Sequence, residues 1–515
     1  MRHLIKFTSL MIHALAIFAF NAQATQEGED QSFEIILGAP FQDHAVLQQL
    51  IPLPIWGETI PGATVRVKFD GQTHETVAEE SGKWKVILTP LKAMMLKSVN
   101  EPPEGQMLTI TARVGNEVQT QIVKDVLIGE VWIGAGQSNM AGSLRTIITK
   151  KKGLNGESVL DGHHIKKHKL DYYPSDTISG AKFPAIRQLV SPLREWSVCS
   201  PETAWKFKKV CFFFARVLQK EILLPIGIIS TAVGGSKIET WHNQSPYPVG
   251  KNYLGKVDPI LGYGIRGLLW YQGESNEKDG RDYHPKIESL IQGWRNVWNQ
   301  FDSADLHGPK QLFSTYFVQL PGIGVSPRNM PLMGDGRAEI RQACLSTLRL
   351  KNTGMAIALD LGDLKEHPPN KFDIGRRLAQ LALHYDYVKK KVVPSGPIYR
   401  SHIVNGSSIV INFDHAGEGL MIAEKSAIRP PLSKPKTSLG WVSIRDEDKS
   451  WHWADARIQG STLVVSSPTV KNPDAVRYAY TTRPTGPLLY NKAGLPASPF
   501  TTCGYDGGEN MILKE

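Results

Sequence analysis

Residues 126–142, VLIGEVWIGAGQSNMAG, carry the pattern that decides the fold of this chain. The segment starts with a mostly apolar run, as in a strand covered on both faces, and the run stops at Gly134 and Gly136. Glycines at that point permit a tight turn. The pattern predicts that Ser138 is a nucleophile at the end of a buried strand, near backbone N–H groups that can stabilise an oxyanion. The alternative is that Ser138 is an ordinary helix N-cap.

The N-terminus has the features of a secretory signal. Arg2 and Lys6 flank the start of an apolar stretch over residues 7–20, and Ala22-Gln23-Ala24 is a typical cleavage site. We therefore expect removal of the signal peptide, residues 1–24, and a secreted or periplasmic protein. The apolar stretch is too short to span a membrane comfortably, and no later segment approaches that length. No stable membrane insertion is expected.

The formal net charge of +10 comes partly from short lysine runs at residues 150–152, 166–167 and 389–391. These runs lack the regular aromatic residues of a groove for single-stranded nucleic acid, so we predict solvated loops and no nucleic-acid partner. The four cysteines are too few for a disulfide scaffold. Cys211 lies in an amphipathic helical pattern and is predicted to be a buried thiol.

Three regions of the chain differ in their pattern of apolar residues and turn signals. Residues 35–124 contain short β-rich segments separated by turn signals, which predicts an N-terminal β-sandwich-like domain. Residues 125–390 alternate apolar strands with helices, which predicts an α/β domain with a helix-covered parallel sheet. Residues 391–515 return to short β segments and predict a C-terminal β-rich domain. In the middle domain the expected strands are 126–134, 226–232, 267–272, 313–320 and 355–361, and the expected helices include 203–222 and 371–388.

Chemically suggestive residues follow the carboxyl ends of four of these strands. Ser138 follows the first strand, Gly234 and Gly235 follow the second, and residues 272–276 and 363–367 follow two others. In open α/β sheets, sites form outside the carboxyl ends of the strands. This coincidence predicts a hydrolytic site.

His367 is the best candidate for the base that takes the serine proton, because it lies on a loop after a strand and before a probable helix. The competing interpretation is a surface or packed histidine, since the chain contains 15 histidines. Gly234 offers a backbone N–H close to substrate, or it belongs to a simple turn. Gln272 is a further oxyanion donor, or part of a satisfied structural network. Five residues are expected to bind substrate or support the loops: Gln137, Asn139, Gly235, Glu274 and Asn276.

These segments together resemble the sialate O-acetylesterase family within the SGNH hydrolase superfamily. The matching pieces in the middle domain are residues 136–140, 234–235 with 239–241, 270–276, and 360–363 with 367–368. The resemblance extends to residues 41–43 and 46–48 near the start, and to residues 476–479 and 494–500 near the end. It thus covers nearly the whole mature chain.

The resemblance implies a flavodoxin-like, three-layer SGNH hydrolase domain between the two β-rich domains. It implies Ser138 as nucleophile, His367 as general base, and an oxyanion hole formed by the Ser138 and Gly234 N–H groups and Gln272. No metal or other cofactor is expected. SGNH enzymes commonly place the triad aspartate three residues before the histidine, where this chain has Leu364. Asp363 is our choice.

Other groups remain open for the role of orienting the imidazole. Asp360 and Glu366 are nearby in the sequence, and a Ser-His dyad oriented by a backbone carbonyl is a rival to the triad.

The implied activity is that of an exported carbohydrate O-acetylesterase, with acetylated carbohydrate as its partner and O-acetylated sialic acid as the first substrate. Acetylated plant or algal polysaccharide of the xylan or pectin type is an alternative, because loop changes on one fold redefine the leaving alcohol. A catalytically degenerate carbohydrate-binding protein is the alternative from another class.

Overall fold

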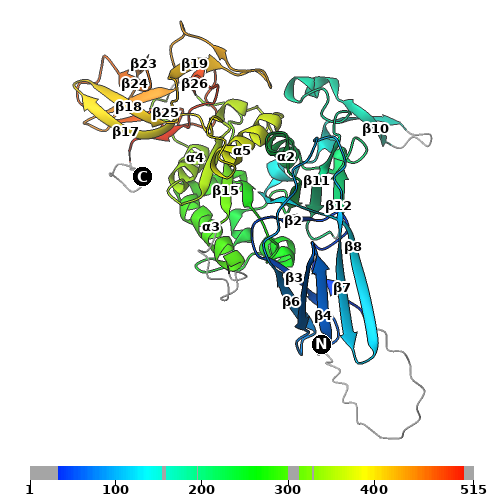
Figure 1. Cartoon of the computed structure of the whole chain (residues 1–515). Coiled ribbons are helices and arrows are strands. Elements are labelled where there is room, and N and C mark those ends of the chain that lie inside the picture. The colour runs from blue at the N-terminus through cyan, green and yellow to red at the C-terminus, as the bar shows by residue number, and fades with distance from the viewer. Residues whose placement is uncertain (1–32, 153–157, 194, 300–311, 328–329, 504–515) are drawn as a thin grey trace, which may run out of the picture.

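The computed structural model describes residues 33–152, 158–193, 195–299, 312–327 and 330–503. Figure 1 shows a long β region at the N-terminal end, a central region rich in helices and a second β region at the C-terminal end. The expected signal peptide, residues 1–24, lies outside the described residues. Within those ranges, no helix combines the length and apolar character that crossing a membrane requires.

The N-terminal region consists of short strands, which pair antiparallel except at residues 46–48. They are β1 (Ile36–Leu37), β2 (Val46–Gln48), β3 (Leu53–Glu58), β4 (Thr64–Phe69), β5 (Gln72–Val77), β6 (Lys83–Leu88) and β7 (Gln106–Val114). One sheet has the order β1-β3-β6, and β4 pairs with both β5 and β7. Exposed and buried residues alternate along β4, as in a strand with one face on a core. The β-rich segment expected from the sequence is therefore present.

The long strand β8 (Glu117–Gly136) joins the N-terminal strands to the central sheet. Its first half pairs antiparallel with β7, and its second half lies in the central sheet. The pairing shifts register opposite Asp125, which has a positive φ of 53°. The expected boundary between residues 124 and 125 thus falls at a bulge within one continuous strand. Beyond it, every residue from Val126 to Gly136 is buried, as the apolar run predicts.

The central sheet adds six strands beside β8. They are β11 (Phe183–Val190), β12 (Trp196–Cys199), β13 (Ile226–Ser230), β14 (Gly267–Tyr271), β15 (Ser314–Gln319) and β16 (Thr353–Ile357). Their order is β12-β11-β13-β8-β14-β15-β16, and all neighbours are parallel except β12, which is antiparallel to β11. Four of the five expected strands are confirmed within a few residues. The fifth, expected over residues 355–361, lies at residues 353–357, and residues 359–361 form a 3-10 helix instead. Strand β11 and the edge strand β12 are additions to the expected set.

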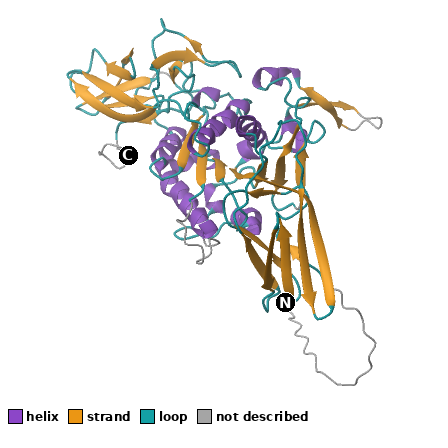
Figure 2. Cartoon of the chain, viewed as in Figure 1, coloured by secondary structure: helices purple, strands orange, loops and turns teal. Residues whose placement is uncertain are grey.

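Helices surround this sheet in Figure 2. They are α1 (Ser138–Ala141), α2 (Lys209–Ile222), α3 (Tyr283–Asn299), α4 (Gly336–Thr347) and α5 (Phe372–Tyr385). Helix α2 packs against α5, and α3 packs against α4. Helices α2 and α5 confirm the helical patterns read from the sequence. Cys211 lies in α2 and is a buried free thiol, as expected.

The remaining strands form a hairpin beside the sheet and the C-terminal β region. The hairpin strands are β9 (Ile148–Lys152) and β10 (Ser158–Ile165). The C-terminal strands are β17 (Ile398–Asn405), β18 (Ser408–Asp414), β19 (Leu420–Glu424), β20 (Leu432–Ser433), β21 (Val442–Asp446), β22 (Trp451–Trp453), β23 (Asp455–Gln459), β24 (Thr462–Ser466), β25 (Pro473–Tyr478), β26 (Leu488–Asn491) and β27 (Phe500–Thr501). They form three small sheets that are antiparallel wherever strands pair. The expected C-terminal β region is therefore present.

Candidate active site

The turn after β8 holds Ser138 at the carboxyl edge of the central sheet. Gly136 has a φ of 129°, and a Cβ on it would lie 2.1 Å from the carbonyl oxygen of Tyr271. Only glycine fits this close approach to β14. The next N–H, of Gln137, donates to that same carbonyl at 2.9 Å. Gln137 is the N-cap of α1, and Ser138 is its first helical residue. Ser138 is therefore not a helix N-cap.

The structure brings Ser138 and His367 together. His367 Nε2 lies 2.9 Å from Ser138 Oγ, within hydrogen-bonding distance. His367 lies on the loop between β16 and α5, and its side chain is exposed to solvent. A neutral imidazole in this position can accept the hydroxyl proton as the oxygen attacks a carbonyl carbon.

Gly234 lies beside the serine. The N–H of the preceding residue, Val233, donates to the carbonyl of Gly136 at 2.9 Å. A Cβ built on Gly234 would lie 3.9 Å from Ser138 Cβ. Gly235 completes the turn with a φ of 67°, a left-handed conformation that favours glycine. Within the described part of the chain, neither the Ser138 nor the Gly234 N–H donates a hydrogen bond. Both donors are therefore available for an oxyanion that forms beside Ser138.

Gln272 does not fit the oxyanion role expected of it. Its side chain is buried, and Nε2 donates to Asn276 Oδ1 at 2.7 Å and to the Ser236 carbonyl at 3.1 Å. Its Oε1 accepts a hydrogen bond from Tyr283 Oη at 2.9 Å. An amide nitrogen has two hydrogens, and both have protein acceptors here. Gln272 therefore belongs to a satisfied structural network, which was the competing interpretation.

This network also contains two of the expected support residues. Gln137 Oε1 accepts a hydrogen bond from the Ser275 N–H at 3.1 Å, and it lies 3.2 Å from Gln272 Nε2 as a third acceptor that shares the two hydrogens of that amide. Asn276 Oδ1 accepts from the Ile238 N–H at 2.9 Å. Its Nδ2 donates to Glu239 Oε2 at 2.9 Å. The network thus ties the loop after β14 to the turn after β8 and to the segment that follows Gly235.

A second buried hydrogen-bond network contacts the backbone on both sides of His367. Asn139 Nδ2 donates to Glu274 Oε1 at 2.6 Å and to the Glu366 carbonyl at 3.2 Å. Lys371 Nζ donates to Asn139 Oδ1 at 2.6 Å and to the Pro368 carbonyl at 2.7 Å. Glu366 and Pro368 are the two neighbours of His367 in the chain. The backbone on both sides of the imidazole is therefore fixed by buried donors.

The charges in this second network are strongly desolvated. Burial lowers the pKa of Lys371 to about 7, with a further lowering by Lys209 and an opposing effect of Glu274. Burial raises the pKa of Glu274, against the hydrogen bond from Asn139. Glu274 Oε2 is buried and has no hydrogen-bond partner among the described residues. Such perturbed groups are frequent at functional sites.

The sequence reasoning missed Lys371. This lysine is the N-cap of α5, where a cation opposes the helix dipole. Asp, Asn, Ser and Thr are the usual residues at that position. A lysine at the start of a strongly amphipathic helix, directly after the histidine loop, was the signal that could have identified it.

The structure does not bring Asp363 to the imidazole. Asp363 Oδ1 accepts a hydrogen bond from the Leu364 N–H at 2.7 Å, as in a short turn. Asp360 forms a buried two-oxygen ion pair with Arg377, at 2.6 and 2.7 Å. Glu366 is exposed and contributes its carbonyl to Asn139. Within the described ranges, the only hydrogen bond of the His367 side chain is the one to Ser138.

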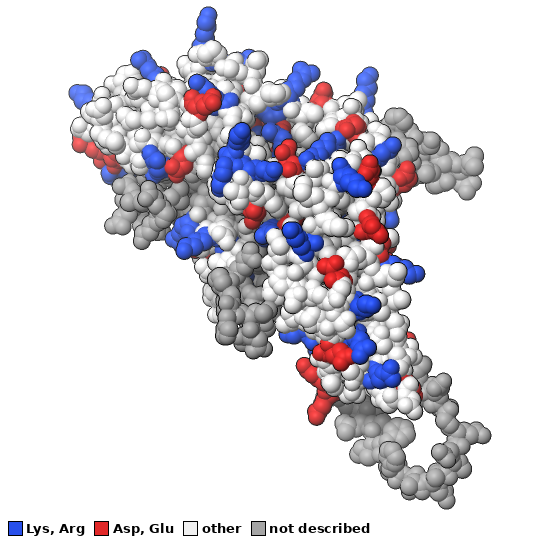
Figure 3. Space-filling model, in the orientation of Figure 1, with Lys and Arg blue, Asp and Glu red and all other residues white. Residues whose placement is uncertain are grey.

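Two further features concern possible ligands. Among the described residues, no group of three or more His, Cys, Asp and Glu side chains has an arrangement that could hold a metal ion. On the face drawn in Figure 3, basic and acidic side chains are interspersed over the surface.

Comparisons with known proteins match the chain to esterases. Residues 128–303 match the family of carbohydrate esterases described as sialic acid-specific acetylesterase, a range that includes Ser138, Gly234 and Gln272 and ends before His367. The sialate O-acetylesterase of Homo sapiens is 26% identical over 510 residues, covering 88% of this chain and 90% of its own. That of Pongo abelii is 26% identical over 502 residues, covering 87% and 88%.

A solved structure agrees with these relatives. The crystal structure of a carbohydrate acetylesterase from Xanthomonas citri is similar to this chain, with a TM-score of 0.73 and 28% sequence identity. The similarity covers 91% of this chain and 99% of the other. It therefore includes the β-rich regions on both sides of the central sheet.

Proposed function

We propose that this chain, an esterase whose resemblance to the sialate O-acetylesterase family is confirmed, removes acetyl groups from carbohydrates through a serine acyl-enzyme. The observation that carries this proposal is the 2.9 Å contact between Ser138 Oγ and His367 Nε2. O-acetylated sialic acid is the first substrate, because relatives along nearly the whole chain are named for it. Acetylated plant or algal polysaccharide is the alternative, since one fold supports several leaving alcohols.

The reaction follows from the positions of these groups. Ser138 Oγ attacks the acetyl carbonyl carbon while His367 Nε2 takes its proton. The carbonyl oxygen becomes an oxyanion, which the N–H groups of Ser138 and Gly234 stabilise. The intermediate collapses, the imidazolium returns the proton to the sugar oxygen, and the sugar leaves as an alcohol. A water molecule then attacks the acetyl-enzyme with His367 again as base, which releases acetate and restores the serine.

For the orientation of His367 we propose a Ser-His dyad held by its loop. Asp360 is occupied by Arg377, and Asp363 accepts a hydrogen bond from its own neighbour. Asn139 and Lys371 hold the carbonyls on either side of His367. These contacts support a role for the loop backbone in orienting the ring. The triad with Asp363 remains the alternative to test.

The wider assignments are part of the same proposal. We assign the central domain, residues 125–390, to the flavodoxin-like three-layer hydrolases. With β11 and β12 set apart as an addition at one side of the sheet, the strand order β13-β8-β14-β15-β16 is 2-1-3-4-5 in the order of the chain, which supports this assignment. Residues 35–124 and 391–515 are its flanking β domains. We propose export through the signal peptide, residues 1–24, to the periplasm or the medium. N-terminal sequencing of the protein recovered outside the cytoplasm tests the cleavage after Ala24.

The mature protein and its Ser138→Ala variant test the function. We expect the protein to hydrolyse p-nitrophenyl acetate and to release acetate from an O-acetylated sialoside or from acetylated xylan. Ser138→Ala should lower kcat by roughly 10⁶-fold, as nucleophile losses do elsewhere. Ser143→Ala, a change of the same size five residues further on, is the matched control. Substantial activity in folded Ser138→Ala would overturn the mechanism. No acetate release from any acetylated glycan would support the degenerate binding protein instead.

A further inference from the structure

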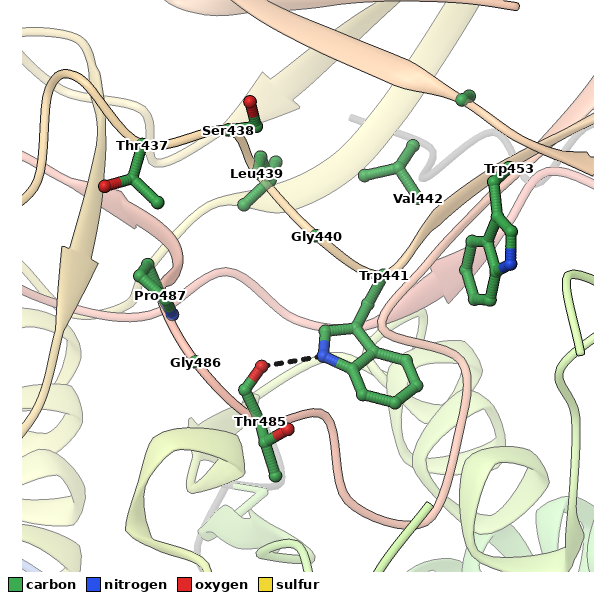
Figure 4. A pocket seen from close by; sticks show the side chains of 11 residues that line it. Thr437, Ser438, Leu439, Gly440, Trp441, Val442, Trp453, Thr485, Gly486 and Pro487 are labelled. Atoms are coloured by element: carbon green, nitrogen blue, oxygen red, sulfur yellow. Dashed lines mark hydrogen bonds between the residues drawn. The ribbon is translucent and has the colours of Figure 1, made fainter. Parts of the chain in front are cut away.

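A pocket of about 410 Å³ lies in the C-terminal β region. Its wall consists of the segment between β20 and β21, the end of β22, and the segment before β26 (Figure 4). This volume falls within the range of roughly 300–1,000 Å³ that is usual for small-ligand sites. The pocket is separate from Ser138 and His367, which do not line it.

Two tryptophans give this pocket its aromatic surface. Trp453 is 36% exposed, although large apolar side chains are usually covered. Trp441 is almost buried, and its Nε1 donates to the Thr485 carbonyl at 2.8 Å, which fixes the ring. The two rings are perpendicular, with an interplanar angle of 80° and centroids 6.2 Å apart. A ligand in this pocket therefore meets one fixed ring, of Trp441, and one accessible ring, of Trp453.

The rest of the lining is uncharged and combines apolar side chains with hydroxyl groups and glycine backbone. None of the residues that line the pocket is Asp, Glu, Lys, Arg or His. Thr437 and Ser438 are exposed at one side and offer hydroxyl groups. Gly440 and Gly486 leave backbone accessible because they have no side chain. A sugar ring has this same combination of apolar C–H faces and hydroxyl edges, and a neutral sugar brings no charge to be desolvated.

The pocket is connected to the catalytic loop through a short path of contacts. Arg483, two residues before Thr485, donates from Nη1 to the Gly324 carbonyl at 2.9 Å. The neighbouring Ile323 forms a parallel β-bridge with Asp363, four residues before His367. Arg341 donates from Nη1 to the Thr481 carbonyl at 2.6 Å and holds the start of this segment against α4. The segment that lines the pocket is therefore packed on the catalytic region.

We propose that this pocket binds a neutral sugar residue of the glycan whose acetyl group is removed at Ser138. That the sugar belongs to the substrate glycan rests on the proposed function. That the pocket binds a neutral sugar rests on its lining alone. The pocket anchors the glycan away from the ester and leaves the reacting groups unchanged.

The test is isothermal titration calorimetry on the full mature chain with two acetate-free probes. Lacto-N-tetraose represents the neutral part of animal glycans, and xylohexaose represents plant polysaccharide. Trp453→Ala removes the exposed ring. Gly440→Phe is designed to fill the pocket, and a Cβ at this position would meet no atom within 4 Å. Thermal unfolding checks that this variant is folded. Ile403→Ala changes an apolar residue that is 62% exposed in the same region and outside the pocket.

We expect one of the probes to bind the parent and Ile403→Ala equally. Trp453→Ala and Gly440→Phe should weaken binding by about tenfold or more, as loss of a tryptophan anchor does. With the matching acetylated glycan, the same two variants should raise KM and leave the hydrolysis of p-nitrophenyl acetate unchanged. Binding of a probe by a protein without esterase activity would overturn the proposed function and support the sugar-binding site. No binding of either probe at millimolar concentration, or equal binding by all variants, would overturn the site and leave the esterase assignment intact.

Discussion

Lys371 Nζ donates a hydrogen bond to Asn139 Oδ1 at 2.6 Å, and this contact joins the residue after Ser138 to the start of the helix behind His367. The same nitrogen donates to the carbonyl of Pro368, next to the histidine. The segments that carry nucleophile and base thus share one buried support. We therefore expect the relative position of Ser138 and His367 to depend on Lys371.

Replacing Lys371 by Met should keep the fold and lower kcat for p-nitrophenyl acetate by roughly 10²-fold, because small displacements of a reacting group cost about that much. The substitution removes both hydrogen bonds but conserves the length of the side chain. Lys365→Met, in the same loop and exposed, is the control and should behave like the parent. A Lys371→Met variant with parental kcat and a lowered Tm would assign Lys371 a purely structural role.

The stability of the protein should also depend on Lys371 in a defined pH range. Burial lowers the pKa of Lys371 to about 7 in the folded chain, while a lysine in the unfolded chain titrates near about 10.4. Between these two pKa values the unfolded chain binds one proton more than the folded chain. The contribution of this group to the free energy of unfolding therefore increases by about 1.4 kcal/mol for each unit that the pH rises. The Tm difference between the parent and Lys371→Met should therefore widen in favour of the parent as pH rises through this range. A difference that stays constant with pH would show that Lys371 is charged in the fold throughout.

Asp363→Asn should leave kcat within a few-fold of the parent value. The asparagine side-chain oxygen can still accept the Leu364 N–H, which is the hydrogen bond that Asp363 makes. Asp360→Asn should mainly lower Tm, because it leaves Arg377 buried with a weakened partner. Both variants are compared by kcat and by thermal unfolding, with Glu366→Gln as an exposed control. A loss of 10²-fold or more in folded Asp363→Asn would restore the triad with Asp363.

Chelation should leave the activity unchanged. The chain has no HExxH motif, and Ser138 with His367 accounts for ester hydrolysis without a Lewis acid. The measurement is kcat after dialysis against EDTA, compared with the untreated protein. Activity that falls on dialysis and returns with a divalent ion would contradict this expectation.

Much of the site could be predicted because its reactive residues lie just after the carboxyl ends of strands. Strand β8 is fully buried from Val126 onwards, and its residues are correspondingly apolar, so both the strand and its exit at Gly136 are visible in the sequence. His367 could be placed opposite Ser138 because parallel strands end at one edge of a sheet. Gln272 could not be assigned, since its amide serves equally well as a donor to substrate or to the Asn276 side chain.

The sequence by itself determined five strands of the central sheet, the turn at Gly136, and the pairing of Ser138 with His367, because these depend on local patterns of burial and on the order of elements. Only the tertiary structure decided which polar groups form hydrogen bonds with one another. Lys371, Asn139 and Glu274 meet from three separate segments, and their desolvation arises only when those segments pack together. The pocket beside Trp441 and Trp453 likewise exists only because β21, β22 and the segment before β26 lie side by side. Hydrogen-bond partners and desolvation are properties of contacts between distant residues, and no local pattern in the chain encodes them.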